Sequence, residues 1–258
     1  TAQYPTLLGV CPSRMAALFL YNNEDYYLQI DAHMLFQKDW DEVLLDSYNN
    51  IKTKENIDFP LITTYVPWWS NDENNNIMHY SPVSDVKSGP MEYDKNGHTW
   101  APVPVQTTTY VDWSQRDYVE HYGLSAHFIF TSGKFVYEIL PDIQMMFFGE
   151  EMTTAVRAWT RGYRIFCIPD PIVWHYNKDI RVSNVYKYDR WITVGNEKLY
   201  MDFEDKQTRS WLRTRKILTG EILGEWGATT KEALDSYTRA ANFSFVEFYK
   251  KLDMLTKN

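Results

Sequence analysis

The stretch Tyr26-Tyr-Leu-Gln-Ile-Asp-Ala-His-Met-Leu-Phe-Gln-Lys-Asp-Trp-Asp-Glu42 decides the fold. Residues 26–30 are mostly bulky and aromatic, which predicts a buried strand. The strand ends in Asp31 and His33, and residues two apart on an extended chain point the same way, so we expect both side chains to converge. A carboxylate oxygen beside an imidazole suits Mn²⁺ better than Ca²⁺. The pattern therefore predicts a strand that ends in a metal site.

Asp31 and His33 also have an ordinary structural interpretation. An aspartate after an apolar strand often only caps the following turn, and a histidine is more often a hydrogen-bonded core residue than a metal ligand. The two residues alone leave both interpretations open, so the rest of the chain must decide between them.

The composition limits the possible functions. The chain of 258 residues can bury a large core, and its 10 Trp, 19 Tyr and 13 Phe suit either an aromatic core or surfaces that stack on sugar rings. The net charge of −8 argues against binding nucleic acid by phosphate neutralisation alone. No apolar run approaches the roughly 20 residues of a membrane span. Two cysteines make no disulfide framework, so we expect a cytoplasmic protein without a membrane partner.

Hydrophobic patterns predict further helices and strands along the chain. The apolar run 16–21 predicts a short helix, in a segment whose notable cation is Arg14. Asp39 and Glu42 have the spacing of a capping box before a helix over 40–52. We also expect strands at 61–69, 163–168 and 172–174. A further strand at 123–132 should be followed by a turn at Ser132-Gly133 and a short continuation to Tyr137. Helices are expected over 206–218, after Thr229 and after Ser244.

A strongly amphipathic helix follows Phe147-Phe-Gly-Glu-Glu151. Apolar residues from Met152 to Trp159 recur at the spacing of one helix face, and Gly162 ends it. Further on, the strand 172–174 runs directly into His175, so a second strand ends in a residue that can bind a metal.

These motifs together resemble the Skp1-type hydroxyproline GlcNAc-transferases, which are retaining enzymes of the GT-A fold. The similar stretches cover nearly the whole chain: 27–33, Trp40-Asp41, 147–151, 157–163, 171–175, 223–227 and 231–237. The polypeptide GalNAc-transferases are more distantly similar, with Asp-x-His and a later His as manganese ligands. The resemblance implies an α/β, GT-A-like catalytic domain over 1–200, whose N-terminal nucleotide-binding part is short or missing, and a helical extension over 201–258.

The resemblance also implies roles for individual residues. It assigns the metal, Mn²⁺ or Mg²⁺, to Asp31, His33 and His175; donor binding to Arg14, Asp31, Lys178 and Arg181; catalysis to Glu150 and Glu151; and acceptor binding to His127, Phe128 and Trp159. Other interpretations stay open for several of these. The three basic residues can equally be solvated surface charges, one of the two glutamates can serve only the helix dipole, and Phe128 can belong to the core.

The implied function is metal-dependent transfer of a GlcNAc-like sugar from a UDP-sugar to a hydroxyl of a protein, a glycan or a modified DNA base, with retention. Two alternatives remain. One is a non-catalytic carbohydrate-binding or scaffold protein of the same fold, and the other is a viral-type transferase that glycosylates modified DNA bases. We also expect the segment 176–191, rich in charged and aromatic residues, to close over the donor as a lid.

Overall fold

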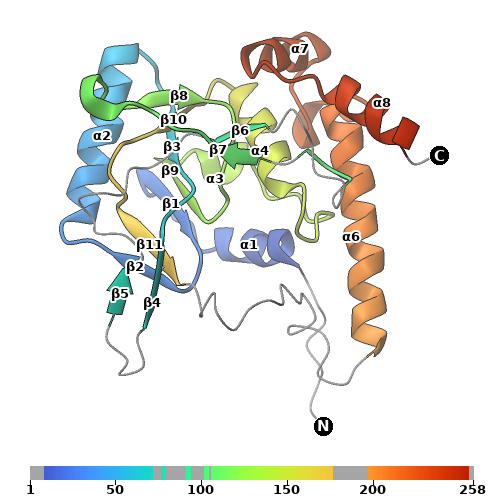
Figure 1. The fold of residues 1–258 in the computed structure, drawn as a ribbon, viewed down its shortest axis with the longest axis horizontal. Coiled ribbons are helices and arrows are strands. Elements are labelled where there is room, and N and C mark those ends of the chain that lie inside the picture. The colour runs from blue at the N-terminus through green and yellow to red at the C-terminus, as the bar shows by residue number, and fades with distance from the viewer. Residues whose placement is uncertain are drawn as a thin grey trace.

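The computed structural model describes residues 9–71, 77–79, 91–93, 102–104, 106–176 and 197–255. They form an α/β fold in which helices cover both faces of a five-stranded sheet (Figure 1). A second sheet of four strands extends from one end of the first, and a two-stranded sheet lies near the C-terminal helices. The predicted α/β class with a helical C-terminal segment is confirmed.

The five-stranded sheet has the order β1-β9-β3-β10-β8. Its strands are β1 (Tyr26–Ile30), β3 (Pro60–Thr63), β8 (Val119–His121), β9 (Phe128–Ser132) and β10 (Arg164–Cys167). Only β3 and β10 are parallel, and the other neighbours pair antiparallel. The predicted strand at 26–30 is confirmed, with Ile30 opposite Phe128 on β9, but it lies at the edge of the sheet and is only partly buried, not buried as expected.

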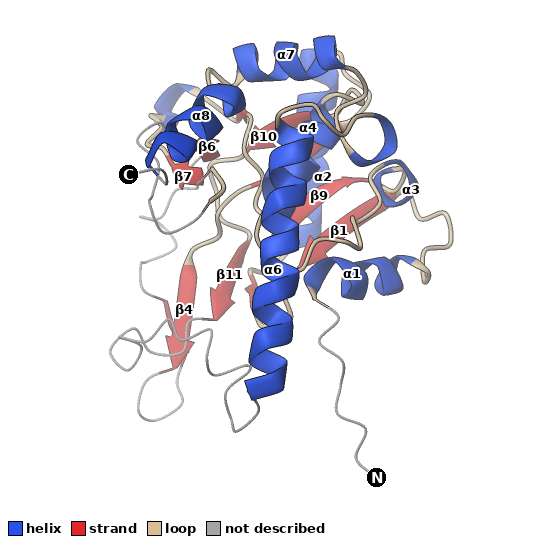
Figure 2. Ribbon diagram, turned by 90° about the vertical axis from the view of Figure 1, so that its right-hand side faces the viewer, coloured by secondary structure: helices blue, strands red, loops and turns tan. Residues whose placement is uncertain are grey.

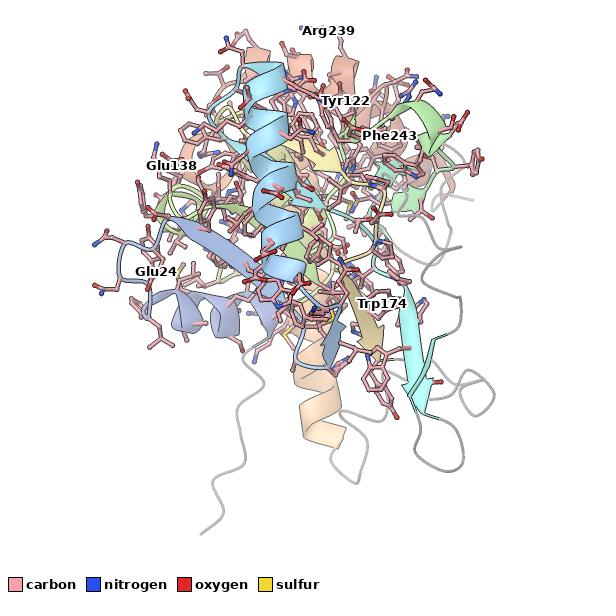
Figure 3. All side chains as sticks on the ribbon, turned by 90° about the vertical axis from the view of Figure 1, so that its left-hand side faces the viewer. Glu24, Tyr122, Glu138, Trp174, Arg239 and Phe243 are labelled. Carbon is pink, nitrogen blue, oxygen red and sulfur yellow. The ribbon has the colours of Figure 1, made fainter. Side chains whose placement is uncertain are left out.

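Alternating side chains bury both faces of this sheet. On β9, Phe128 and Phe130 pack towards α2 (Trp40–Glu55), together with Leu44 and Ile51 of that helix. Ile129 points the other way, into the cluster that contains the apolar face of α4 (Glu150–Trp159). Figure 3 views the molecule from the α2 side, with the sheet behind that helix. The sheet is therefore the middle of three layers.

The second sheet has the order β2-β11-β4-β5. Its strands are β2 (Met34–Phe36), β11 (Val173–Tyr176), β4 (Trp68–Asn71) and β5 (Ile77–His79), and the two-stranded sheet pairs β6 (Met91–Tyr93) with β7 (Gln106–Thr108). The single strand predicted at 61–69 is wrong, because β3 and β4 belong to different sheets. Between them lies Pro67, which has no N–H to donate to a continuing ladder.

The remaining helices differ from the predictions mainly at their ends. They are α1 (Val10–Leu18), α3 (Phe135–Glu138), α6 (Glu197–Leu218), α7 (Lys231–Ala240) and α8 (Phe245–Leu255), with 3-10 turns η1 (Trp113–Gln115) and η2 (Gly224–Trp226). α1 begins earlier than the predicted 16–21, and α3 replaces the predicted strand continuation to Tyr137. Among the described residues, none of the helices is both long and apolar enough to span a bilayer.

The predicted helix caps are only partly correct. Asp39 precedes α2 with φ 57°, and its side chain makes no capping hydrogen bond, because an N-cap normally needs extended backbone. α7 is capped by Thr230 rather than Thr229, through a 3.1 Å bond from the Ala233 N–H. Ser244 accepts a hydrogen bond from the Glu247 N–H as predicted, at 3.2 Å.

The C-terminal helices share the core of the sheet. Tyr237 of α7 and Phe245 of α8 are buried in the same cluster as Leu61 of β3 and Ile165 of β10. The long helix α6 runs down the face of the molecule that Figure 2 brings forward. The proposed domain boundary near residue 200 stays a prediction. The described residues after it share one hydrophobic core with the sheet.

Gly149 lets α4 begin directly against α6. Its φ is 101°, and a Cβ at this position would lie 1.8 Å from Oγ1 of Thr214. Gly162, just beyond the other end of α4, has a similar φ of 94°, but a Cβ there would meet nothing within 4 Å. A substitution at Gly162 therefore reports backbone strain alone, whereas one at Gly149 reports strain together with steric overlap.

We expect Gly149→Ala to lower the free energy of unfolding by about 3 kcal/mol, because it combines left-handed backbone strain with overlap against Thr214. Gly162→Ala is the matched control and should cost only about 1–2 kcal/mol. Urea unfolding followed by circular dichroism measures both. Equal losses in the two variants would show that the α4–α6 contact does not require a glycine.

Candidate functional site

Asp31, His33 and His175 come together where the two sheets meet. Asp31 follows β1, His33 precedes β2, and His175 lies in β11. Antiparallel pairing of β2 with β11 places His175 opposite Met34, beside His33. One potential ligand atom of each residue lies within 4.8 Å of the others. Asp31 Oδ2 is 3.2 Å from His175 Nε2, and the two imidazole rings are 4.3 Å apart.

A turn brings Asp31 and His33 together, not the extended chain that the sequence suggested. Residues 31–33 connect β1 to β2, and Ala32 and His33 form the turn. The hydrogen bond from the Tyr176 N–H to the His33 carbonyl, at 2.9 Å, fixes this turn against the end of β11. The three residues predicted to bind a metal are thus adjacent, for a different local reason.

The electrostatic environment keeps Asp31 and His33 in the forms that bind metals. The hydrogen bond with His175 is the main reason that the pKa of Asp31 is lowered, and the nearby Arg14 guanidinium adds to this effect. Desolvation by burial, followed by the neighbouring His175, lowers the pKa of His33. A carboxylate and a neutral imidazole are the protonation states that a metal ion requires.

The three side chains fit the metal that the resemblance implies. One carboxylate oxygen and two imidazole nitrogens form a mixed donor set that suits Mn²⁺. On His175, Nε2 lies 3.2 Å from Asp31 and is the nitrogen placed to bind the metal, while Nδ1 is buried without a hydrogen-bond partner within the described part of the chain. The position of Nε2 and the mixed donor set favour a ligand role.

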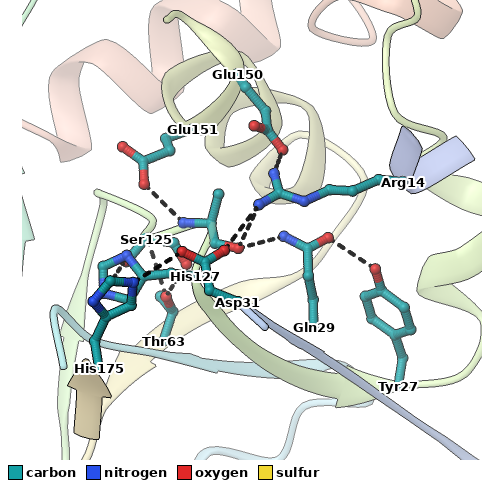
Figure 4. A network of polar contacts seen from close by, with 11 residues as sticks. Arg14, Tyr27, Gln29, Asp31, Thr63, Ser125, His127, Glu150, Glu151 and His175 are labelled. Carbon is teal, nitrogen blue, oxygen red and sulfur yellow. Dashed lines mark hydrogen bonds and ion pairs between the residues drawn. The ribbon is translucent and has the colours of Figure 1, made fainter. Parts of the chain in front are cut away.

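Arg14 of α1 connects the metal-ligand cluster to the start of α4 (Figure 4). Its guanidinium donates to Oε1 of Glu150 through Nη1 and to the Ala126 carbonyl through Nη2, the latter at 3.1 Å. Nη2 also lies 3.8 Å from Oδ1 of Asp31. One cation therefore balances two carboxylates, and it holds Glu150 close to the cluster.

The backbone of Ala126 is bound by side chains at both its N–H and its carbonyl. Oε1 of Glu151 accepts the Ala126 N–H at 2.8 Å. The carbonyl accepts from Nε2 of Gln29 at 2.6 Å, besides its bond from Arg14. The hydroxyl of Tyr27 donates to Oε1 of Gln29 at 2.8 Å. Desolvation by burial raises the pKa of Glu151.

Residues on either side of Ala126 are also held in place. Oγ1 of Thr63 accepts the Ser125 N–H at 3.1 Å and donates to the Phe128 carbonyl at 2.7 Å. Nε2 of His127 accepts the Val66 N–H at 3.3 Å, while Nδ1 lies 2.8 Å from Oγ of Ser125. Burial lowers the pKa of His127 to about 4, so its ring is neutral near pH 7.

The structure does not bring every predicted residue to the cluster. Phe128 is 1% exposed and faces α2, since it shares a strand face with Phe130. Trp159 ends α4, roughly 13 Å along the helix from Glu150, where its ring packs 5.6 Å from that of Tyr237. Phe128 is thus a core residue and Trp159 is partly buried against the core, and acceptor binding by either residue stays a prediction. Lys178, Arg181 and all of the expected lid beyond Tyr176 lie outside the described residues.

Tyr27 and Gln29 were not among the predicted site residues. The available signal was Gln29 itself, a polar residue in the middle of an otherwise bulky strand. Tyr27, Gln29 and Asp31 also fall two residues apart, which places them on one side of the chain. A polar residue on the same strand face as a candidate ligand therefore indicates a functional site.

Comparison with known proteins gives matches of different weight. A family model described as Glycosyltransferase (GlcNAc) matches residues 3–249. Among solved structures, the chain is similar to GalNAc-T7 with UDP, GalNAc and Mn²⁺, with 14% sequence identity and a TM-score of 0.45. That similarity covers 96% of this chain and 44% of the other, so this chain spans less than half of its length. No significant match was found among curated proteins.

We expect Asp31→Asn and His175→Gln to weaken Mn²⁺ binding at least roughly tenfold, because each removes one ligand from the cluster. The free Mn²⁺ signal in electron paramagnetic resonance measures this without any substrate. Asp25→Asn, which changes an exposed aspartate before β1, is the control and should bind as the wild type does. Unchanged Mn²⁺ affinity in both cluster variants, with folding intact by circular dichroism, would exclude this metal site.

Proposed function

This chain belongs to the Glycosyltransferase (GlcNAc) family, and from that premise we propose that it transfers a sugar from a nucleotide sugar to a hydroxyl acceptor. The donor is a UDP-sugar carrying GlcNAc or a similar hexose. The reaction depends on Mn²⁺ or Mg²⁺, retains the anomeric configuration and takes place on a GT-A-like scaffold. The resemblance to Skp1-type enzymes favours a protein hydroxyl as the acceptor.

The cluster of Asp31, His33 and His175 is the observation that carries this proposal. The nucleoside diphosphate leaves with several negative charges, and a bound divalent ion would stabilise that charge. The protein's part is to hold the three ligands where the two sheets meet, with the pKa values of Asp31 and His33 both lowered and with Asp31 36% exposed and so open to a ligand.

Glu150 is the better candidate of the two glutamates for contact with the sugar. Arg14 holds its carboxylate at the start of α4, on the same side as Asp31 (Figure 4). A carboxylate fixed in this way can accept hydrogen bonds from sugar hydroxyls. Glu151 already accepts the Ala126 N–H, so we assign it to holding the chain beside the site.

His127 is the described residue that best fits the predicted acceptor side. Its neutral ring lies beside the cluster, 5.8 Å from that of His175. Arg14 is already shared between Glu150 and Asp31, so its contribution to donor binding is to balance their charge. The roles of Lys178 and Arg181 as cations for the donor diphosphate rest on their positions in the sequence after His175.

We expect the protein to hydrolyse a UDP-sugar slowly in the presence of Mn²⁺ and to stop when the metal is chelated. A panel of UDP-GlcNAc, UDP-GalNAc and UDP-glucose, followed by release of UDP, identifies the donor. The preferred donor at 100 times its Kd should also stabilise the native state by about 2.7 kcal/mol, seen as a rise in Tm only when Mn²⁺ is present.

Two further outcomes of this panel have clear meanings. A metal-dependent rise in Tm without release of UDP, both alone and with hydroxyl acceptors, would indicate a non-catalytic carbohydrate-binding protein instead. No stabilisation and no hydrolysis with any nucleotide sugar would contradict the proposed function altogether. Asp31→Asn should remove both signals, while Asp25→Asn should keep both.

A further inference from the structure

The two faces of β1 have different surroundings. Leu28 and Ile30 pack into the cluster under α2. The other face carries Tyr27 and Gln29, and Asp31 follows on the same side, since side chains two apart share a face. Figure 4 shows these three side chains along the strand, towards Arg14 and the start of α4. Tyr27, Gln29 and the candidate metal ligand Asp31 thus lie in a row on one face of the strand.

The Tyr27 hydroxyl holds the Gln29 amide in place from the side opposite Ala126. The Tyr27 ring stacks on Phe135, with centroids 5.6 Å apart and planes at 18°. Burial raises the pKa of Tyr27 to about 12, so its hydroxyl stays protonated and donates to Oε1 of Gln29. The Ala126 carbonyl can only accept, so it requires the amide N–H, which donates to it at 2.6 Å and leaves the amide oxygen for Tyr27.

Three side chains from three elements bind the backbone N–H and carbonyl of Ala126. Gln29 of β1 and Arg14 of α1 donate to its carbonyl, and Glu151 of α4 accepts its N–H. The N–H and the carbonyl belong to the two peptide groups on either side of the Ala126 Cα, so these contacts fix both groups. The next residue is His127, whose ring lies 5.8 Å from that of His175, so the position of this ring depends on the three contacts.

We propose that Gln29, oriented by Tyr27, is a positioning residue of the sugar-transfer site. Its amide holds the segment 125–127 against Asp31 and His175, so that the His127 ring forms a fixed wall of the site. This inference rests on the proposed function. Gln29 acts on the reaction through Ala126 and need not touch the donor.

Loss of the Gln29 amide has consequences beyond one hydrogen bond. Among the described residues, the Ala126 carbonyl keeps only Arg14 as a side-chain donor, and Arg14 also contacts Glu150 and Asp31. Competition among these three acceptors would shift the segment 125–127 and Glu150 together. Displacements of about 1 Å in a transferase site can reduce turnover roughly 100-fold.

The test compares Gln29→Leu, Gln29→Glu and Tyr27→Phe with the wild type. Leu keeps much of the shape without the amide, and Glu keeps the acceptor but does not donate to Ala126. We expect both Gln29 variants to lower kcat roughly 10- to 100-fold, with the donor KM and Mn²⁺ affinity within about twofold of the wild type. Gln115→Leu and Tyr110→Phe, at exposed positions, are controls that should change nothing.

The double variant Tyr27→Phe/Gln29→Leu shows whether the two residues act as one unit. Tyr27→Phe alone should lower kcat less than Gln29→Leu does, because the amide can still reach Ala126 in part of the population. In the Gln29→Leu background it should cause no further loss, since Tyr27 acts through Gln29. If the fold-reductions in kcat of the two single variants multiply in the double variant, Tyr27 does not act through Gln29 and the proposal is wrong.

Hydrogen exchange supplies a readout that needs no substrate. The Ala126 N–H should exchange faster in Gln29→Leu than in the wild type, while the amides of β9 keep their protection. If the wild type turns over no nucleotide sugar, the proposed function fails and this exchange result still tests the positioning contact. Unchanged exchange at Ala126, or unchanged kcat in both Gln29 variants of an active enzyme, would overturn the inference.

Discussion

The pairing of β11 with β2 is the constraint on which the candidate site depends. It brings His175 beside Asp31, although the two residues are 144 positions apart in the sequence. β11 also pairs with β4, and the His175 N–H donates to the Pro67 carbonyl at 2.9 Å, so the histidine is held from both sides. The metal-ligand cluster is therefore a product of sheet topology.

Charge balance is the second requirement of the arrangement. Asp31 and Glu150 would repel each other near the same point, and Arg14 lies between them with 18% of its side chain exposed. Because Arg14 also binds the Ala126 carbonyl, the same cation links α1, the end of β1, α4 and the segment 125–127. Binding of a metal at Asp31 would thus be coupled to the position of Glu150 through one guanidinium.

Local patterns in the sequence predicted the strand β1 and the amphipathic helix α4, and the family resemblance added the three residues of the cluster. They failed where non-local contacts decide. The strand expected at 61–69 breaks because its halves join different sheets, and Phe128 faces α2 because register with β1 and β3 sets its side of the sheet. The different partners of Glu150 and Glu151 likewise follow from how α4 docks, which adjacent identical residues do not reveal.

Anomalous diffraction at the manganese edge, from crystals grown with Mn²⁺ and UDP, would show whether the cluster binds a metal. We predict one strong peak within bonding distance of the Asp31 carboxylate and of the imidazoles of His33 and His175, with the 3.2 Å contact between Asp31 and His175 replaced by shared coordination. A peak at other residues, or no peak with that contact unchanged, would contradict a metal-dependent transferase site built on these three residues.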